Sequence, residues 1–278
     1  MTVAVLLSLC AALAYGLSDF IGGILTRRAG AWAVAVASQA AALVLAAFFA
    51  LTALATPSAG ALAWGALGGI GSAAGNVFIY RGLGSGRMTV VAPISAIAAA
   101  TLPVMTGIVG GERPGLIALI GVAAALPAVW LVSGGGAGLR GASRSDVVNG
   151  LAAGLGFGTQ FSALGQIPAD AGLAPLALSQ VVSVASIVIG ATMLSSPWVP
   201  RDRYSRLGGF AGLLAGIATI CFQLATQSGL LTIAGVLTSL YPAVTVVMAA
   251  ALLRERVRPL QSVGLLLAGA SVVLIGVG

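Results

Sequence analysis

The sequence predicts an all-α integral membrane protein with ten transmembrane helices, arranged as two inverted five-helix repeats around a central cavity. Three observations support this prediction. The composition is strongly apolar, one passage of the chain occurs twice, and almost all arginines fall on one side of the predicted membrane. Together they indicate a duplicated membrane protein whose two copies cross the bilayer in opposite directions.

Of the 278 residues, 59% are hydrophobic and only 7% are charged, and the mean hydropathy is +1.10. Soluble domains are roughly half apolar and a quarter charged, so this chain belongs in a bilayer. The first apolar stretch has no positive charge before it, and we expect a retained span there and not a signal peptide. The stretches near the roughly 20 residues that a spanning helix needs cover residues 3–25, 31–55, 61–82, 88–109, 115–134, 147–166, 172–195, 207–226, 231–252 and 259–277.

An internal repeat relates the stretch at 88–109 to the stretch at 231–252. Ser85–Arg113 reads SGRMTVVAPISAIAAATLPVMTGIVGGER and Ser228–Arg256 reads SGLLTIAGVLTSLYPAVTVVMAAALLRER, with Ser, Gly, Thr, Met, Glu and Arg in step 143 residues apart. Shorter echoes at nearly the same offset pair Tyr15-Gly16 with Phe157-Gly158 and Ser38-Gln39 with Ser179-Gln180. Matches in one order at nearly one offset indicate a duplication of the whole chain.

The duplication predicts a five-helix repeat at 1–134 and a second at 146–278, joined by a Gly/Ser-rich linker at 135–145. Five is an odd number, so the second copy enters the membrane in the opposite direction and the repeat is inverted. Inverted repeats give many secondary transporters alternating access, with the substrate site near the midplane between the repeats.

The chain has thirteen arginines and no lysine, and its net charge is +7. Twelve arginines lie at connections that follow odd-numbered helices, and only Arg113 lies on the other side. The positive-inside rule then places the odd connections in the cytoplasm and both termini outside, in a multi-pass protein of the cell (inner) membrane. The basic residues are scattered over the loops, which argues against nucleic-acid binding. The twelve are Arg27, Arg28, Arg81, Arg87, Arg140, Arg144, Arg201, Arg203, Arg206, Arg254, Arg256 and Arg258.

Five short motifs give the chain a family likeness: Tyr15–Phe20 (YGLSDF), Val91–Ile94 (VAPI), Gly111–Arg113 (GER), Leu240–Pro242 (LYP) and Arg254–Arg256 (RER). With these motifs the chain resembles the drug/metabolite transporter superfamily, as a ten-helix member with two EamA-type domains. The resemblance implies a cavity bounded mostly by helices 1 to 4 and 6 to 9, with helices 5 and 10 peripheral. It also implies transport of amino acids, other metabolites, nucleotide sugars, sugar phosphates or drugs.

The chain departs from the family pattern in two ways. Members are often drawn with both termini in the cytoplasm, which conflicts with the arginine distribution, and the second Gly-Glu is replaced by Arg254-Glu255. We follow the arginine distribution.

Asp19 is the ionisable residue that falls well inside a predicted span, roughly 12 Å along the helix from Arg27. A carboxylate at that depth is costly unless it is paired, protonated or facing water, which makes it a candidate functional residue. It could bind a cationic or amino group of the substrate, or exchange a proton as the coupling site. The structural alternative is that Asp19 pairs with an arginine or caps a backbone break near Gly22-Gly23.

Further polar residues are candidates for the substrate site because they lie inside predicted spans. Tyr15 is one turn before Asp19, and Asn76 shares a helix face with Tyr80. The remaining candidates are Gln39, Gln160, Gln180, Gln223 and Tyr241. The alternative for each glutamine is an amide hydrogen bond between helices. The two copies differ where Asp19 meets Phe161, Asn76 meets Ile220 and Pro242 meets Ala99.

Pro93, Pro103 and Pro242 remove backbone donors and free carbonyls one turn earlier. Such breaks are tolerated where the freed groups face a cavity or a partner, so helices 4 and 9 are candidate gating elements; a simple kink is the alternative. Glycines spaced by four residues should pack helices closely together: Gly65 and Gly69, Gly71 and Gly75, Gly150, Gly154 and Gly158, and Gly208, Gly212 and Gly216.

An enzyme is not expected, because the chain has no histidine, no lysine and no pair of intramembrane carboxylates from which to build a base and a nucleophile. We expect no catalytic residue, metal or cofactor. The sequence favours a secondary transporter, with export as the expected direction, for a small neutral, zwitterionic or cationic metabolite such as an amino acid, or for a lipophilic drug. Expected partners are the solute, with or without protons, and the lipid bilayer; monomer and homodimer stay open.

Two alternatives remain at this point. One is a non-transporting membrane scaffold or receptor. The other is a carrier of a phosphorylated sugar or nucleotide sugar, which would need arginines in the cavity as phosphate partners.

Overall fold

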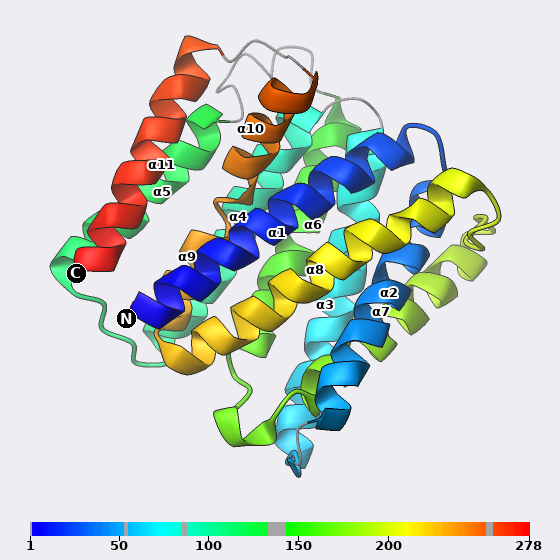
Figure 1. Cartoon of the computed structure of the whole chain (residues 1–278), viewed down its shortest axis with the longest axis horizontal. Helices are drawn as coiled ribbons and strands as arrows, with labels where there is room; N and C mark the ends of the chain where they lie inside the picture. Colours follow the sequence, from blue (N-terminus) through cyan, green and yellow to red (C-terminus); the bar gives the residue numbers. More distant parts are fainter. Residues whose placement is uncertain (1, 53–54, 85–87, 133–142, 254–257) are drawn as a thin grey trace.

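The computed structural model describes residues 2–52, 55–84, 88–132, 143–253 and 258–278, and within these ranges all regular secondary structure is helical (Figure 1). A short 3-10 turn, η2 (Ala169–Ala171), precedes α7. The α-helices are α1 (Thr2–Thr26), α2 (Ala31–Thr52), α3 (Ala59–Gly84), α4 (Met88–Val109), α5 (Leu116–Val132), α6 (Arg144–Leu164), α7 (Ala174–Met193), α8 (Arg203–Ser228), α9 (Leu231–Thr238), α10 (Tyr241–Leu253) and α11 (Pro259–Val277).

Within the described residues, each predicted span overlaps a helix. Eight helical segments of the described chain are long and apolar enough to cross a membrane: α1, α2, α3, α4, α7, α8, the α9–α10 segment and α11. The helix α5 is apolar but has only 17 residues, and α6, with 21 residues, carries polar side chains such as Asn149 and Gln160. The protein is therefore an all-α, multi-pass membrane protein.

The predicted linker at 135–145 falls mostly outside the described residues. Its last part is ordered as the start of α6, because Ser143 is the N-cap: its hydroxyl accepts from the Asp146 backbone N–H at 3.1 Å, and the Asp146 carboxylate accepts from the Ser143 backbone N–H at 2.9 Å. Such a capping box satisfies backbone donors that the first helical turn leaves free. The second half thus begins its helix at Arg144.

The prediction of one continuous helix at 231–252 is wrong in one respect, because a turn at Ser239 and Leu240 divides it into α9 and α10. Pro242 is the second residue of α10, where the proline's missing N–H is not needed by the helix. All eight residues of α9 are buried. This segment is therefore half a span surrounded by protein, followed by a second half that starts at Tyr241.

The helices associate mainly across the two halves of the chain. The helix α1 packs along α8, α6 packs along α3 and α4, and α2 contacts both α7 and α8 (Figure 1). Exchanging each helix for its counterpart in the other half turns the α1–α8 pair into the α6–α3 pair and leaves the α2–α7 and α5–α11 pairs unchanged. This pattern agrees with a two-fold relation between the halves, whose inversion stays a prediction from the helix count.

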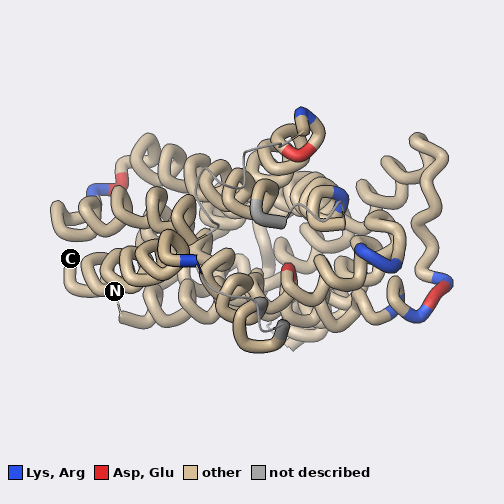
Figure 2. Tube along the Cα trace, turned by 90° about the horizontal axis from the view of Figure 1, so that it is seen from above, with Lys and Arg blue, Asp and Glu red and all other residues tan. Residues whose placement is uncertain are grey.

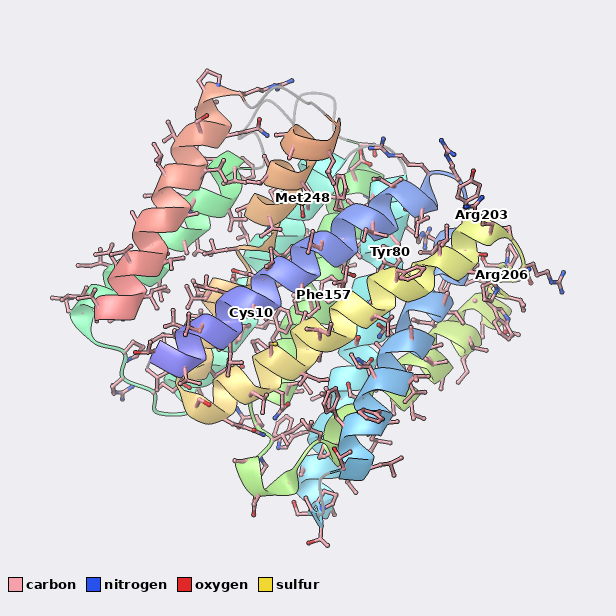
Figure 3. The ribbon with its side chains drawn as sticks, viewed as in Figure 1. Cys10, Tyr80, Phe157, Arg203, Arg206 and Met248 are labelled. Carbon is pink, nitrogen blue, oxygen red and sulfur yellow. The ribbon has the colours of Figure 1, made fainter. Side chains whose placement is uncertain are left out.

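The helices α5 and α11 pack mainly against each other and form a separate layer at one side of the bundle (Figure 1). Both chain ends lie at one end of the bundle, and the arginine-bearing connections after α1 and α7 lie at the opposite end (Figure 1). Charged residues gather mostly at helix ends and connections (Figure 2). Arg203 and Arg206, at the first turn of α8, illustrate this placement (Figure 3).

Close helix contacts depend on glycine, as predicted. Gly69 of α3 lies against the backbone of Ser179 on α7, and Gly212 of α8 lies against the backbone of Ser38 on α2. Ser38 and Ser179 are the two members of one sequence echo, so the same contact is built twice. A methyl group at each other predicted packing glycine would also meet a neighbouring helix: Gly65, Gly71, Gly75, Gly150, Gly154, Gly158, Gly208 and Gly216.

Candidate functional site

Five of the nine predicted substrate-site residues line one internal cavity: Tyr15, Asp19, Gln39, Asn76 and Gln160. We call it the inner cavity. Five residues that sequence reasoning missed complete its lining: Ser18, Ser72, Phe157, Ala215 and Thr219. They come from α1, α2 and α3 of the first half and from α6 and α8 of the second. The cavity volume is about 10 Å³, close to the minimum that holds one water molecule.

Asp19 is the acidic residue of the inner cavity. Among the described residues, no arginine and no hydrogen-bond donor contacts its carboxylate, so the predicted alternative of an arginine partner has no support there. The helix α1 continues unbroken to Thr26, whose hydroxyl donates to the carbonyls of Gly22 and Gly23 at 3.0 and 3.2 Å. The second alternative, a cap on a broken helix at these glycines, is therefore wrong.

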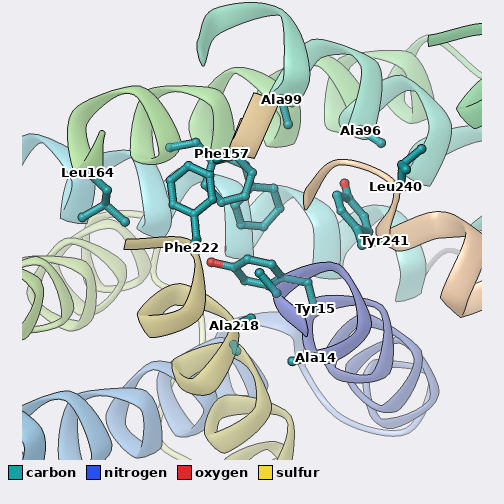
Figure 4. Close-up of a cluster of buried hydrophobic side chains, with 14 of the residues drawn as sticks. Ala14, Tyr15, Ala96, Ala99, Phe157, Leu164, Ala218, Phe222, Leu240 and Tyr241 are labelled. Carbon is teal, nitrogen blue, oxygen red and sulfur yellow. The ribbon is translucent and has the colours of Figure 1, made fainter. Parts of the chain in front are cut away.

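Aromatic rings form one wall beside Asp19. The Tyr15 hydroxyl lies 2.8 Å from the Thr219 hydroxyl, which donates its own proton to the Ala215 carbonyl at 2.7 Å. Tyr15 is thus the donor of the pair. The Phe161 ring lies 5.7 Å from the Tyr15 ring and 4.6 Å from the Phe222 ring, between centroids, and Phe157 belongs to the same cluster (Figure 4).

Amide and hydroxyl groups of Gln39, Ser72 and Asn76 form another part of the cavity wall. The Gln39 Nε2 atom lies 2.8 Å from Ser72 Oγ, 2.6 Å from Ser183 Oγ and 3.2 Å from Gln180 Oε1. An amide nitrogen carries two protons, so these three acceptors share them. Asn76 Nδ2 donates to the Ser72 carbonyl at 3.0 Å. Gln180 therefore acts as an interhelical partner of Gln39 and does not itself line the cavity.

Gln160 and Gln223 are both buried and lack partners, but they lie in different places. Gln160 is 2% exposed, and its Oε1 atom has no hydrogen-bond partner within the described chain although the residue lines the inner cavity. Gln223 is fully buried, neither of its amide atoms has a partner there, and it does not line the cavity. An unsatisfied buried amide is costly, so its presence at a cavity points to a use.

Two predicted tyrosines lie outside the inner cavity. The Tyr80 hydroxyl donates to Ser38 Oγ at 3.5 Å, and the Tyr241 hydroxyl donates to Ser95 Oγ at 3.3 Å. Both side chains are almost fully buried. They contribute to packing around the cavity and not to its lining.

The predicted gating prolines have different settings. Pro93 and Pro103 lie inside α4, which continues as a helix through both, and the Pro103 ring lies against Gly235 of α9. Pro242 follows the turn that separates α9 from α10. The only interrupted helix among these is therefore the one with Pro242, within the residues that the structure describes.

Glu112 joins the two halves at the end of α4. Its carboxylate accepts the backbone N–H groups of Leu231 and Thr232 at 2.6 and 2.9 Å and the Thr232 hydroxyl at 2.6 Å. These groups form the N-terminus of α9, where a negative charge is stabilised by the helix dipole and by free backbone donors. The Gly-Glu-Arg motif of the first half thus caps a helix of the second. The corresponding Arg254-Glu255-Arg256 motif lies outside the described residues.

Helix periodicity around the predicted residues could have found several of the missed ones. Ser72 is one turn before Asn76, and Thr219 is one turn before Gln223. The equivalent contacts of Gly69 and Gly212 set the repeat offset at 143 residues in this region. Asn76 therefore corresponds to Thr219 and not to Ile220, and both members of this pair line the inner cavity.

Comparisons with known proteins agree with the fold. No curated protein sequence matches the chain. A solved structure described only as "Crystal structure of protein" superposes with a TM-score of 0.75 over 98% of this chain and 95% of its own, at 15% identity. This likeness concerns the fold alone. The profile of the EamA-like transporter family matches residues 147–277, from the first residues of α6 to the last residue of α11. The second half of the chain is therefore an EamA-like transporter family domain, of a family of membrane transporters of small solutes.

Proposed function

We propose that the protein is a secondary transporter that exports a small neutral, zwitterionic or cationic solute by alternating access. The observation that carries this proposal is an inner cavity built from helices of both halves, with an uncompensated carboxylate at Asp19. Sites between repeats are where carriers of this architecture hold their substrates. A phosphorylated substrate is disfavoured, because every arginine of the described chain lies at a helix end or in a connection.

The inner cavity must enlarge during transport, because about 10 Å³ holds little more than one water molecule. The turn between α9 and α10 and the prolines of α4 supply the joints for such a movement. The contact of Glu112 with the N-terminus of α9 would then hold α4 and α9 together at the end of the bundle where the chain termini lie. We propose that this contact closes that end of the pathway.

Asp19 is proposed as the residue that couples transport, either by binding a cationic substrate group or by exchanging a proton. The test is flux into liposomes that contain the purified protein, with and without a pH gradient. Asp19→Asn should abolish the pH-dependent part of the flux, and Asp170→Asn, which removes an exposed acid from η2, should leave it unchanged. Unchanged coupled transport in Asp19→Asn removes Asp19 from the mechanism.

We also propose that both termini face away from the cytoplasm, as the arginine distribution predicts. A reporter fused after Gly278 tests this orientation: one that is active only outside the cytoplasm should give a signal. Activity from a cytoplasmic reporter alone contradicts the proposal.

A further inference from the structure

Two acceptor groups of the inner cavity have no donor among the described residues, whereas several donors of its lining are already used. Ser18 donates to the Ala211 carbonyl at 2.8 Å, Asn76 donates to the Ser72 carbonyl, and Tyr15 and Thr219 donate along their chain to Ala215. The Gln39 Nε2 protons are shared among three acceptors. In contrast, the Gln160 Oε1 atom has no partner within the described chain, and no described donor contacts the carboxylate of the half-buried Asp19.

This imbalance favours one ligand chemistry. A carboxylate at membrane depth is costly unless it is paired, protonated or hydrated, and a cation is one such partner; a buried carbonyl oxygen needs a donor. A primary ammonium group supplies both, because it carries a positive charge and three N–H donors. A carboxylate or phosphate group would instead meet like charge at an ionised Asp19.

The size and the walls of the inner cavity sharpen this choice. An ammonium group is close to a water molecule in size, and it fits about 10 Å³ better than a trimethylated head group does. Phe157 and Tyr15 line the same cavity, and aromatic faces attract cations. Phe161 and Phe222 pack behind this wall, with ring centroids 5.7 Å (Tyr15 to Phe161) and 4.6 Å (Phe161 to Phe222) apart, so an enlarged cavity would present apolar groups to the rest of the ligand.

We propose that the inner cavity binds the primary ammonium group of an amphipathic amine, between the Asp19 carboxylate and the Gln160 carbonyl oxygen. This inference rests on the proposed transport function and names its substrate class. Asp19 provides the negative charge, and Gln160 favours ammonium head groups that have N–H donors over fully methylated ones.

The experiment measures thermal stabilisation of the detergent-solubilised protein by three probes that share a phenylethyl group and differ in the head group. These are 2-phenylethylammonium, its neutral analogue 2-phenylethanol, and the N,N,N-trimethyl derivative. Ligand that binds the folded state raises the apparent melting temperature according to its affinity. We expect stabilisation by the primary ammonium compound, and at least about tenfold weaker binding of the other two.

Variants assign the two contacts. Gln160→Met keeps the side-chain volume and should weaken ammonium binding about tenfold or more, as expected for the loss of a hydrogen bond to a charged group. Gln160→Glu keeps an acceptor and should retain binding. Asp19→Asn should lower affinity further. Gln227→Leu, which replaces another glutamine with an unpaired amide atom but outside the cavity lining, should change nothing.

Equal stabilisation by 2-phenylethanol overturns the charge requirement, and equal stabilisation by the trimethyl compound overturns the role of Gln160. Flux of another solute without any ammonium binding overturns this inference and leaves the transport function intact. Ammonium binding without flux in liposomes supports the site and contradicts the transport function. If Gln160→Met does not fold, Gln160→Ala is tested in its place. Loss of the preference for the primary ammonium probe over the trimethyl probe supports the role of Gln160, and a retained preference contradicts it.

Discussion

Gln39 donates a hydrogen bond from its Nε2 atom to Oε1 of Gln180 at 3.2 Å, and the two residues occupy equivalent positions of the sequence repeat. Two equivalent residues touch when both lie beside the axis that relates the halves. The surroundings of the pair are unequal, because Ser72 and Ser183 also accept from Gln39, and their counterparts at the repeat offsets of this region are Ala215 and Ala42. The two serines therefore add hydrogen bonds to Gln39, and the equivalent alanines add none to Gln180.

This inequality predicts that the two glutamines differ in their contribution to stability. Gln39→Leu removes a donor shared by three acceptors and should lower the free energy of unfolding by about 2–3 kcal/mol, whereas Gln180→Leu removes one acceptor and should cost about 1 kcal/mol. Thermal unfolding in detergent measures both. Equal losses contradict the hydrogen-bond assignment, and Gln166→Leu, in the exposed turn after α6, controls for a general effect of the substitution.

Glu112→Ala should destabilise the junction between the halves, because three donors at the start of α9 lose their acceptor. A lost helix cap costs about 1–2 kcal/mol, and Glu112→Gln should cost less because one acceptor oxygen remains. Unfolding midpoints measure the loss, and cysteine pairs placed on α4 and α9 report separation of the helix ends. Arg113→Ala, a change at the exposed neighbour, should be neutral.

Gly69→Ala and Gly212→Ala should each be strongly destabilising, since the added methyl group meets the backbone of Ser179 or Ser38. Overpacking of this kind costs about 1–3 kcal/mol. Gly269→Ala is the matched control, because a methyl group there meets nothing within 4 Å. It should stabilise α11 by about 1 kcal/mol, the difference in helix propensity. Unfolding midpoints that fall equally in all three variants would falsify the packing role.

Asp202 predicts a dependence of stability on pH at the start of α8. The backbone N–H and the hydroxyl of Ser205 donate to its carboxylate at 2.9 and 2.7 Å, and these hydrogen bonds hold the pKa of the Asp202 carboxyl below its usual range. A lowered folded-state pKa stabilises the protein above the unfolded-state pKa of about 3.9, and this contribution disappears as the pH falls through the folded-state pKa. The stability difference between the native chain and Asp202→Asn should therefore shrink between pH 7 and pH 2, as followed by thermal unfolding.

Helix positions could be predicted closely because the bilayer requires long apolar stretches, and each predicted span overlaps a helix within the described residues. The interruption before Tyr241 could not be predicted from proline alone. Pro93, Pro103 and Pro242 all lie in apolar segments, yet only the last follows a break. The difference depends on the neighbours of each segment, which a single sequence does not specify.

The inner cavity could be predicted in part, for a similar reason. Periodicity shows that Asn76 and Tyr80 share a face of α3, but not how deep in the bundle each one lies. Asn76 reaches the cavity, and Tyr80, one turn later, is covered by packing against Gly22. How deep a side chain lies in the bundle depends on partner helices from the other half. The sequence alone therefore does not show which residues near the repeat axis line the cavity and which are covered by packing.

The complete burial of α9 means that this short helix never meets lipid. Its environment is protein on every side, made of α1, α4, α5, α6 and α8. Because α9 has no face toward the bilayer, its residues need not be apolar, and the helix contains the buried Thr232 and Thr238. A helix enclosed in this way also cannot shift by itself. Any displacement of α9 requires its neighbours in both halves to move as well, so α9 couples the two halves and does not move as an independent element.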